Sequence, residues 1–224
     1  MMGPAQIPLT FVPMKVDIWS DVRCPFCYIG KRKFEAALNQ FAHKDKVEVE
    51  WHSFELDPHA ETLPDADPAQ HLANKYGRSL EWATEMQENV TKTAAEVGLT
   101  FHLEKSVIAN SFDAHRLIQL AKTEGLGDEV EEQLFLAYFT HSKNISDHQT
   151  LIEIGVKIGL DRLTVQTMLN GTDFTDEVRY DEQTAQNIGV RGVPFFVFDQ
   201  KLAVSGAQPP ESFLGAMEQA FGNT

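Results

Sequence analysis

Cys24 and Cys27 are the only cysteines in this 224-residue chain, and two residues separate them. They follow a short apolar run at 15–20 and precede apolar residues that recur at helical spacing. Side chains at positions i and i+3 of a first helical turn lie close enough to form a disulfide. The free N–H groups and partial positive charge of a helix N-terminus stabilise a thiolate. The spacing therefore predicts one reactive cysteine with a resolving partner close by.

A zinc site and a structural disulfide are the alternatives for the same pair. Structural zinc usually takes four protein ligands, and the chain has no second C-x-x-C and no histidine pair at zinc-finger spacing. A disulfide that closes so short a loop adds little stability. The redox interpretation is therefore favoured, and no metal site is expected. We expect Cys24 to be the exposed nucleophile and Cys27, one turn into the helix, to be the more buried resolving thiol.

The chain is acidic, with a formal net charge of −14. Because such a surface repels phosphates, we expect no nucleic-acid partner. No apolar run is long enough to span a membrane. Residues 1–13 lack a charged start and are interrupted by three prolines, so they do not resemble a secretory signal. Two cysteines without a signal favour the cytoplasm.

The first part of the chain reads as strand, helix, strand. Residues 15–20 form a short apolar run, and 47–54 alternate between apolar and polar side chains, so both are expected strands. The helix between them contains Gly30, which should weaken or kink it, and the basic cluster 31–33, which should form a solvated face. This order fits a βαβ unit with parallel strands.

Residues 67–189 read as almost wholly helical, with five or six helices. Candidate N-caps precede them: Asp67, Ser79, Asn110 or Ser111, Asp128, Asp147 and Asp161. Candidate glycine stops follow them: Gly98, Gly125, Gly159 and Gly189. This block interrupts a pattern that otherwise consists of strands and two helices.

The end of the chain returns to strands. Residues 195–198 and 202–205 are apolar runs joined by the turn Asp199-Gln200, and a last helix follows Pro209-Pro210. The order βαβ, helical block, ββα predicts an α/β protein of the thioredoxin fold, with a four-stranded mixed sheet and a large all-helical insertion. We assign 14–63 and 190–222 to a discontinuous thioredoxin-like domain and 64–189 to the insertion, which should cover the active-site side.

Pro194 lies directly before the expected hairpin, in the segment Gly192-Val193-Pro194. Only about one X–Pro bond in twenty is cis, so a trans proline that starts a strand is the ordinary interpretation. The alternative is a cis proline that faces the cysteines and leaves the Val193 backbone free to pair with an extended substrate. In this layout we favour the cis interpretation.

Four segments carry a resemblance to a known family. They are residues 24–30 (CPFCYIG), 110–117 (NSFDAHRL), 189–196 (GVRGVPFF) and 205–208 (SGAQ). Together they resemble the FrnE-like branch of the DsbA thioredoxin-fold oxidoreductases, and the resemblance extends from Val16 to Phe221. It implies a bacterial protein thiol–disulfide oxidoreductase with Cys24 and Cys27 as catalytic residues and Val193-Pro194 as the cis-proline loop.

Differences from related branches refine this expectation. Kappa-class glutathione transferases and hydroxychromene carboxylate isomerases usually carry serine at the first cysteine position, so Cys24 argues against their chemistry. Some FrnE-like proteins have a second cysteine pair, and this chain has none. Phe26 stands where DsbA has a histidine, which removes a nearby cation, so we expect a less oxidising pair than in DsbA.

Three further residues are candidates for substrate binding. Phe26 could belong to an apolar rim around the thiols, together with Tyr28, Phe112 and Phe139, although aromatic residues at helical spacing are more often core. Asn110 and His115 could line the cleft, with His115 assisting proton transfer or contacting substrate. Alternatively, Asn110 is a helix cap and His115 is a buried helix histidine.

The predicted reaction is thiol–disulfide exchange with a protein or a small thiol or disulfide. It needs no cofactor beyond the Cys24–Cys27 disulfide, with glutathione as an alternative co-substrate. One rival is a glutathione-dependent transferase or isomerase, which would survive Cys27→Ser. The other is a non-catalytic peptide-binding or chaperone-like module that uses the cleft beside Pro194 and would still bind after Cys24→Ser. The sequence is compatible with a monomer or a homodimer.

Overall fold

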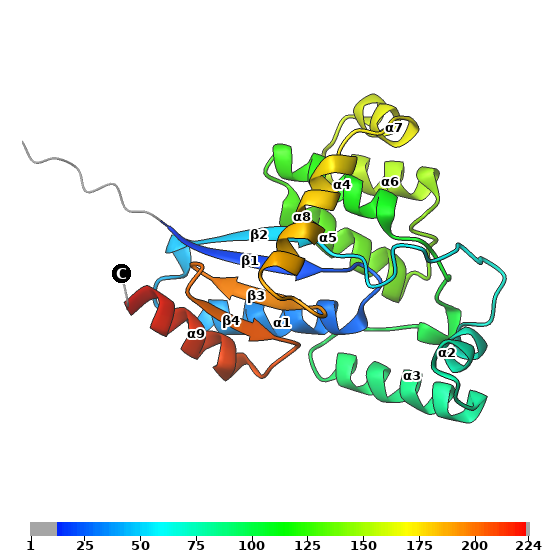
Figure 1. Ribbon diagram of the computed structural model, residues 1–224, viewed down its shortest axis with the longest axis horizontal. Coiled ribbons are helices and arrows are strands. Elements are labelled where there is room, and N and C mark those ends of the chain that lie inside the picture. Colours follow the sequence, from blue (N-terminus) through cyan, green and yellow to red (C-terminus); the bar gives the residue numbers. More distant parts are fainter. Residues whose placement is uncertain (1–12, 223–224) are drawn as a thin grey trace, which may run out of the picture.

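A four-stranded mixed sheet forms the centre of the fold (Figure 1). The computed structural model describes residues 13–222, so the expectation about a signal in the first twelve residues lies outside the described part. The strand order is β2-β1-β3-β4. The bounds of the strands are Met14–Ser20 for β1, Val47–Ser53 for β2, Phe195–Phe198 for β3 and Leu202–Ser205 for β4. β1 pairs parallel with β2, and β3 pairs antiparallel with β4, as the sequence predicted. β1 also pairs antiparallel with β3, which makes the sheet mixed.

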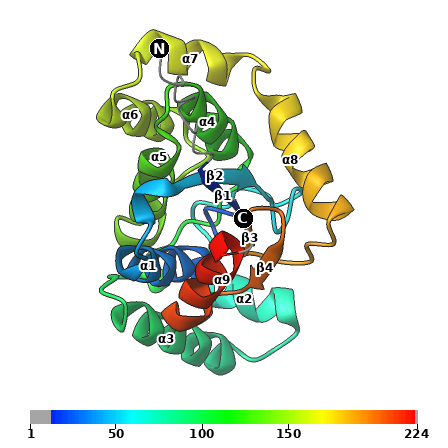
Figure 2. The same ribbon diagram turned by 90° about the vertical axis from the view of Figure 1, so that its left-hand side faces the viewer.

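Two helices, α1 (Pro25–Gln40) and α9 (Pro210–Gly222), cover one face of the sheet and lie side by side (Figures 1 and 2). Their apolar faces meet the sheet through aromatic rings. Phe34 of α1 and Phe213 of α9 both pack on Phe196 of β3, with ring centroids 5.6 and 4.6 Å away. Burial of such large side chains is the main stabilising term at this face.

Seven α-helices lie between β2 and β3. Their bounds are Pro68–Tyr76 for α2, Leu80–Ala95 for α3, Phe112–Thr123 for α4, Gly127–Phe135 for α5, His148–Ile158 for α6, Arg162–Asn170 for α7 and Thr175–Asn187 for α8. Helices α2 and α3 pack together apart from α4–α7, and α8 packs against β2 (Figure 1). The expected number of five or six was too low. Residues 171–174 separate α7 from α8, and Phe174, with a positive φ of 64°, precedes α8, so the segment after Asp161 is two helices.

Most of the predicted helix caps are present. The carboxylates of Asp67, Asp147 and Asp161 and the hydroxyl of Ser79 each accept a backbone N–H at the start of their helix. The prediction for Asp128 was wrong, because this residue lies in the first turn of α5 and the helix begins after Leu126. Its carboxylate instead accepts hydrogen bonds from Lys31 and Trp51.

Helix α1 explains one expected residue and corrects another expectation. The helix continues through Gly30 over 16 residues, and a Cβ atom at this position would lie 2.9 Å from the Cγ atom of Pro194, so the close approach of the chain requires glycine. The basic cluster is not simply a solvated face, because Lys31 is only 2% exposed. Its ammonium group pairs with Glu35 of α1 and with Asp128 and Glu132 of α5.

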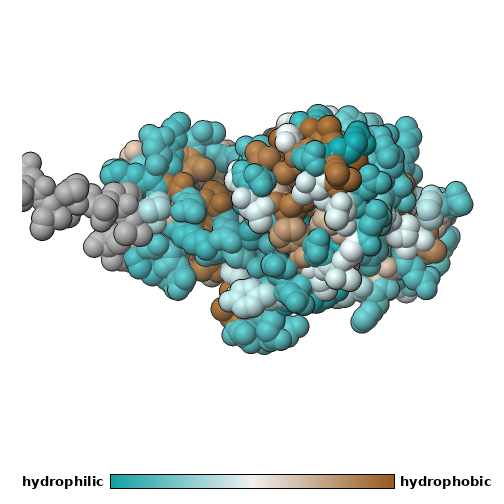
Figure 3. All heavy atoms as spheres, turned by 90° about the horizontal axis from the view of Figure 1, so that it is seen from above, coloured by the Kyte–Doolittle hydropathy of each residue, from teal (hydrophilic) through white to brown (hydrophobic). Residues whose placement is uncertain are grey.

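No helix within residues 13–222 is long and apolar enough to cross a lipid bilayer. Figure 3 shows one face of the molecule on which hydrophilic residues predominate and hydrophobic residues form separate patches. This distribution agrees with the acidic composition of the chain.

Candidate active site

Cys24 is the N-cap residue of α1, and Pro25 occupies the first helical position. The loop before the helix is fixed by two backbone bonds, from the Cys24 amide to the Asp21 carbonyl (2.9 Å) and from the Cys27 amide to the Cys24 carbonyl (3.0 Å). Both thiols are free. The side chain of Cys24 therefore lies at the positive end of a helix, where a thiolate is stabilised.

The expectation that Cys24 would be exposed was wrong. Cys24 is 5% exposed and Cys27 is 1% exposed, so the predicted order of burial holds but both thiols are buried. The carbonyl oxygen of Val193 lies 3.6 Å from the Cys24 sulfur and covers part of it.

The Val193–Pro194 peptide bond is cis, as predicted. The carbonyl of Pro194 accepts a hydrogen bond from the amide of Gly206 (2.8 Å), which fixes this loop against the turn that follows β4. Pro194 also packs closely on Gly30 of α1. Three of the four segments that carry the family resemblance, 24–30, 189–196 and 205–208, therefore meet around Cys24.

Two hollows in the surface border this contact. A cavity of about 480 Å³ contains Cys24 and Phe26 in its wall, and α2 and α3 supply Leu72, Trp82 and Met86. Phe26 is 45% exposed, which fits an apolar rim. A second hollow of about 510 Å³ contains Val193 and Pro194 in its wall. A substrate disulfide at Cys24 would have apolar walls on one side and the backbone of the cis-proline loop on the other.

Asn110 does not line this cavity. Its Oδ1 atom accepts the Phe112 amide (2.8 Å) and its Nδ2 atom donates to the Ala60 carbonyl (3.2 Å). These bonds fix the start of α4 and the loop after β2, so the structure gives Asn110 a structural role. The rim is also smaller than expected: Phe139 lines the cavity with Phe26, whereas Tyr28 is buried and stacks on Phe135, with ring centroids 4.8 Å apart.

His115 is fully buried and cannot contact a substrate in the cavity. Its Nε2 atom lies 3.7 Å from the Oδ1 atom of Asp21. Burial lowers the pKa of His115. The carboxylate of Asp21 raises this pKa by more than burial lowers it, so the net direction is upward. Burial raises the pKa of Asp21, whereas His115 and Arg23 lower it more, so its net direction is downward. Neither ring nitrogen of His115 has a hydrogen-bond partner among the described residues, so the two buried groups are in contact without a hydrogen bond between their side chains.

Glu131 is a further buried acid in this region that the sequence did not single out. It is 1% exposed, and its Oε1 atom accepts a hydrogen bond from the Ser20 hydroxyl (2.7 Å). Burial raises the pKa of Glu131 to about 7. It lies in an acidic stretch of α5 in which Asp128 and Glu129 are exposed and Glu132 is half-buried. The spacing of Val130 and Leu134 gives no sign that the carboxylate of Glu131 points inward.

Cys27 is buried together with these polar side chains. Burial raises the pKa of the Cys27 thiol, and the neighbouring Cys24 raises it further. The backbone of Asp21 and the hydroxyl of Ser20 lower this pKa in part. Cys27 is therefore a thiol that holds its proton unless a neighbouring group removes it.

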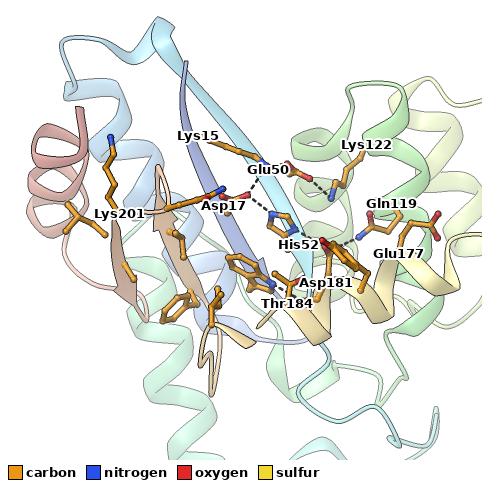
Figure 4. A pocket seen from close by; sticks show the side chains of 18 of the residues that line it. Lys15, Asp17, Glu50, His52, Gln119, Lys122, Glu177, Asp181, Thr184 and Lys201 are labelled. Carbon is orange, nitrogen blue, oxygen red and sulfur yellow. Dashed lines mark hydrogen bonds and ion pairs between the residues drawn. The ribbon is translucent and has the colours of Figure 1, made fainter. Parts of the chain in front are cut away.

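A groove of about 1090 Å³ lies elsewhere, between the sheet and α8 (Figure 4). Figure 4 shows His52 between the carboxylates of Asp17 and Asp181, to which its ring nitrogens are bonded at 2.7 and 2.8 Å. Asp17, Glu50 and His52 offer donor atoms close enough to share a metal ion. Lysine ammonium groups already pair with both carboxylates of this set, so we assign no metal to it. The groove contains no cysteine.

Comparison with known proteins places the chain in a family. The sequence profile described as the DSBA-like thioredoxin domain matches residues 15–218. The chain belongs to the DSBA-like thioredoxin domain family. In this family, the crystal structure of a probable DsbA oxidoreductase from Streptomyces coelicolor superposes with a TM-score of 0.89 at 40% identity, over 94% of this chain and 91% of that one.

Other relatives are more distant. The uncharacterized protein YwbO of Bacillus subtilis is 28% identical over 199 residues, which are 88% of this chain and 92% of that protein. The structure of a 2-hydroxychromene-2-carboxylate isomerase superposes with a TM-score of 0.65 at 16% identity, over 93% of this chain and 95% of that one. This last likeness concerns the fold alone. Because one fold accommodates different chemistries, function must be argued from the site.

Proposed function

We propose that this DSBA-like protein is a thiol–disulfide oxidoreductase of the FrnE-like branch. The observation that carries the proposal is the position of Cys24: its thiol caps α1, faces a cavity, and lies 3.6 Å from the carbonyl of Val193. Cys27 lies directly behind it in the same helical turn. This arrangement provides a nucleophile, a resolving thiol and a backbone that can hold a substrate strand.

The reaction has two steps. The Cys24 thiolate attacks one sulfur of a substrate disulfide, the substrate S–S bond breaks, and one substrate thiolate leaves and is protonated. Cys27 then attacks the Cys24 sulfur, the bond between Cys24 and the substrate breaks, and the second substrate thiol leaves. The substrate gains two electrons, and the Cys24–Cys27 pair loses two as it becomes a disulfide. The reverse sequence oxidises a dithiol.

The substrate class follows from the walls of the site. We propose a peptide or small-molecule disulfide whose backbone meets Val193 and whose apolar side chains meet Phe26. The absence of further cysteines in the 224-residue sequence favours the cytoplasm as the compartment.

Trapping of the first intermediate tests the proposal. Reduced Cys27→Ser protein is mixed with a peptide disulfide, and adducts are identified by mass spectrometry after acid quenching. We expect a stable peptide adduct on Cys24, no adduct with Cys24→Ser, and only transient adduct with the unchanged protein. Failure of Cys27→Ser to form an adduct under conditions that keep Cys24 reduced would falsify the proposed exchange.

A glutathione-dependent isomerase or transferase is the second candidate, because the same fold also occurs in a hydroxychromene carboxylate isomerase, although that likeness is one of fold alone. Such an enzyme uses glutathione without a resolving thiol. Activity on a small electrophile that needs glutathione and survives Cys27→Ser would support this candidate over disulfide exchange.

A further inference from the structure

We propose that Arg23 and Tyr138 bind a carboxylate of the substrate inside the cavity beside Cys24, and so select disulfides that carry an acidic group close to the reacting sulfur. The inference rests on the proposed function and deepens it, because it names the class of disulfide that the site accepts. It also assigns a binding role to two residues that the sequence analysis did not single out.

The wall of this cavity differs in charge from the rest of the chain. The sequence has 33 acidic residues against 19 lysines and arginines, yet the described residues of the wall include Arg23, His71 and Lys75 and neither aspartate nor glutamate. The groove between the sheet and α8, by contrast, has five carboxylates in its wall. Because like charges repel, the cavity accepts an anionic group more readily than a cationic one. Lys75 already pairs with Asp57 (3.2 Å), which leaves Arg23 as the permanent cation available to a ligand.

Arg23 directly precedes Cys24 and carries a guanidinium group with unused donors. Its Nη1 atom donates to the carbonyl of Ala109 (2.7 Å), which holds the group in place. Its Nε atom is enclosed and has no partner in the described part of the chain, since the Asp21 carboxylate lies 3.9 Å away, beyond hydrogen-bond distance. Its Nη2 atom also has no partner there but is not enclosed, so it can donate into the cavity.

Tyr138 supplies a second unused donor to the same wall. It lies in a turn of π-helix, Leu136–Thr140, that continues α5, and such turns are frequent at functional sites. Tyr138 is 8% exposed, and its hydroxyl has no hydrogen-bond partner among the described residues, although buried hydroxyls normally have one. Its oxygen keeps accessible surface, so the hydroxyl opens into the cavity. Burial raises the pKa of Tyr138 to about 12 and the charge of Arg23 opposes this rise, so the hydroxyl is a protonated donor at neutral pH.

The two donors meet the needs of an anion in an otherwise apolar cavity. Leu72, Trp82 and Phe139 belong to the remaining wall, and a carboxylate moved from water into such surroundings costs free energy unless it is hydrogen-bonded. Guanidinium and hydroxyl groups give a carboxylate charge-assisted hydrogen bonds, which are stronger where water is excluded. The site therefore fits a carboxylate joined to the reacting sulfur by an apolar segment, such as an acidic side chain or a chain end near the cysteine of a peptide.

The test measures the attack of Cys24 on matched peptides. Reduced Cys27→Ser protein is mixed with peptides whose single cysteine is activated as a pyridyl disulfide, and the coloured pyridinethione that is released gives the rate. Pairs of end-blocked peptides, otherwise identical and apolar, carry Glu or Gln one, two or three positions from the cysteine. A further peptide carries Gln and a free C-terminal carboxylate, which distinguishes a chain end from a side chain. The ratio of the Glu rate to the Gln rate cancels any change in the reactivity of Cys24 itself.

We expect a ratio of about tenfold at one or more spacings, because charge-assisted hydrogen bonds distinguish Glu from its uncharged isostere. Faster reaction of the free-ended peptide than of its blocked form would support the same site and assign the carboxylate to a chain end. When Arg23→Gln is added to the Cys27→Ser protein, the ratio should fall to about one. Tyr138→Phe, which removes the hydroxyl and keeps the ring, should lower it to about threefold, and it gives an answer should Arg23→Gln fail to fold. Lys92→Gln removes a cation of α3 that is 72% exposed, and this matched control should keep the full ratio.

Three results would overturn the carboxylate site. The first is a ratio near one at every spacing with Arg23 and Tyr138 both present, together with no gain from a free chain end. The second is a full ratio that persists in both Arg23→Gln and Tyr138→Phe, and the third is an equal loss of the ratio in Lys92→Gln, which would indicate general charge attraction.

Failure of every peptide to form an adduct at Cys24 would instead count against the proposed exchange reaction, so the two failures are distinguishable. In that case, calorimetry with Cys24→Ser protein and S-methylated peptides still tests the site. We expect the Glu peptide to bind about tenfold more tightly than the Gln peptide, and equal affinities would overturn the inference.

Discussion

The sulfur of Cys24 and the carbonyl oxygen of Val193 lie 3.6 Å apart although 169 positions separate them in the chain. The contact forms because Pro194 rests on Gly30, one turn and a half into the helix that Cys24 caps. The glycine in the helix and the proline before β3 therefore fix the distance between the nucleophile and the backbone proposed to hold its substrate.

Gly30→Ala should disturb this contact. The added Cβ atom would lie 2.9 Å from Pro194 Cγ, closer than such atoms approach, so the loop must move. Overpacking of this kind costs about 1–3 kcal/mol, partly offset by the better helix propensity of alanine. We expect a lower free energy of unfolding in urea and slower adduct formation at Cys24.

Gly215→Ala is the matched control, because a Cβ atom there meets nothing within 4 Å. It should be neutral or stabilising by up to about 1 kcal/mol. Equal effects of the two substitutions would show that contact with Pro194 is not the cause.

His52 should make stability depend on pH. Burial lowers the pKa of His52, but its bonds to Asp17 and Asp181 raise it more, to a value above the ordinary 6.5. The imidazolium therefore stabilises the fold fully below pH 6.5, and this contribution is lost as the pH rises through the folded-state pKa. His52 lowers the pKa of both carboxyls, so their contribution is present at neutral pH and lost in acid.

His52→Gln should reduce the free energy of unfolding by about 3 kcal/mol at mildly acidic pH, because two buried carboxylates lose their cation. The alkaline decline in stability should become smaller in this variant. Urea unfolding at a series of pH values measures both effects, with the exposed His59→Gln as control. The explanation fails if the unchanged protein and His52→Gln lose stability in parallel as the pH rises.

Arg116→Met should destabilise the insertion. The buried guanidinium donates to the carbonyls of Gly171 and Asp173, both at 2.8 Å, and so holds the turn between α7 and α8. Methionine keeps most of the side-chain volume but leaves these carbonyls without their donor and leaves Asp113 with His148 alone, at a cost of about 3 kcal/mol. Arg162→Met, at an exposed position, should change stability by no more than about 0.5 kcal/mol. A small difference between the two urea midpoints would contradict the assigned role.

Features set by local chemistry could be predicted from the sequence. The strands follow from short apolar runs, and the hairpin follows from Asp199 and Gln200, which both adopt positive φ. The cysteine pair at a helix start and the cis bond before Pro194 also depend on neighbouring residues and on the order of elements. These signals sufficed for the sheet topology and for the core of the candidate site.

Features set by long-range packing could not be predicted. Nothing near Cys24 in the sequence indicates that Val193 covers it, and nothing near His115 indicates that it faces Asp21. Lys31 and Glu131 look like exposed helix residues, yet both are buried. Lys31 pairs with Asp128 of α5, and Glu131 contacts Ser20 of β1. The contact of Glu131 with Ser20 joins residues that are 111 positions apart in the chain.

The redox equilibrium of Cys24 and Cys27 tests the central claim most directly. The protein is equilibrated in glutathione buffers of increasing oxidation, free thiols are trapped, and the products are counted by mass spectrometry. We predict that both thiols disappear together in one two-electron transition to an intramolecular disulfide. Its potential should lie between those of thioredoxin, about −270 mV, and DsbA, about −120 mV. A protein that carries glutathione adducts but never forms the Cys24–Cys27 disulfide, even in the most oxidising buffer, would contradict the account.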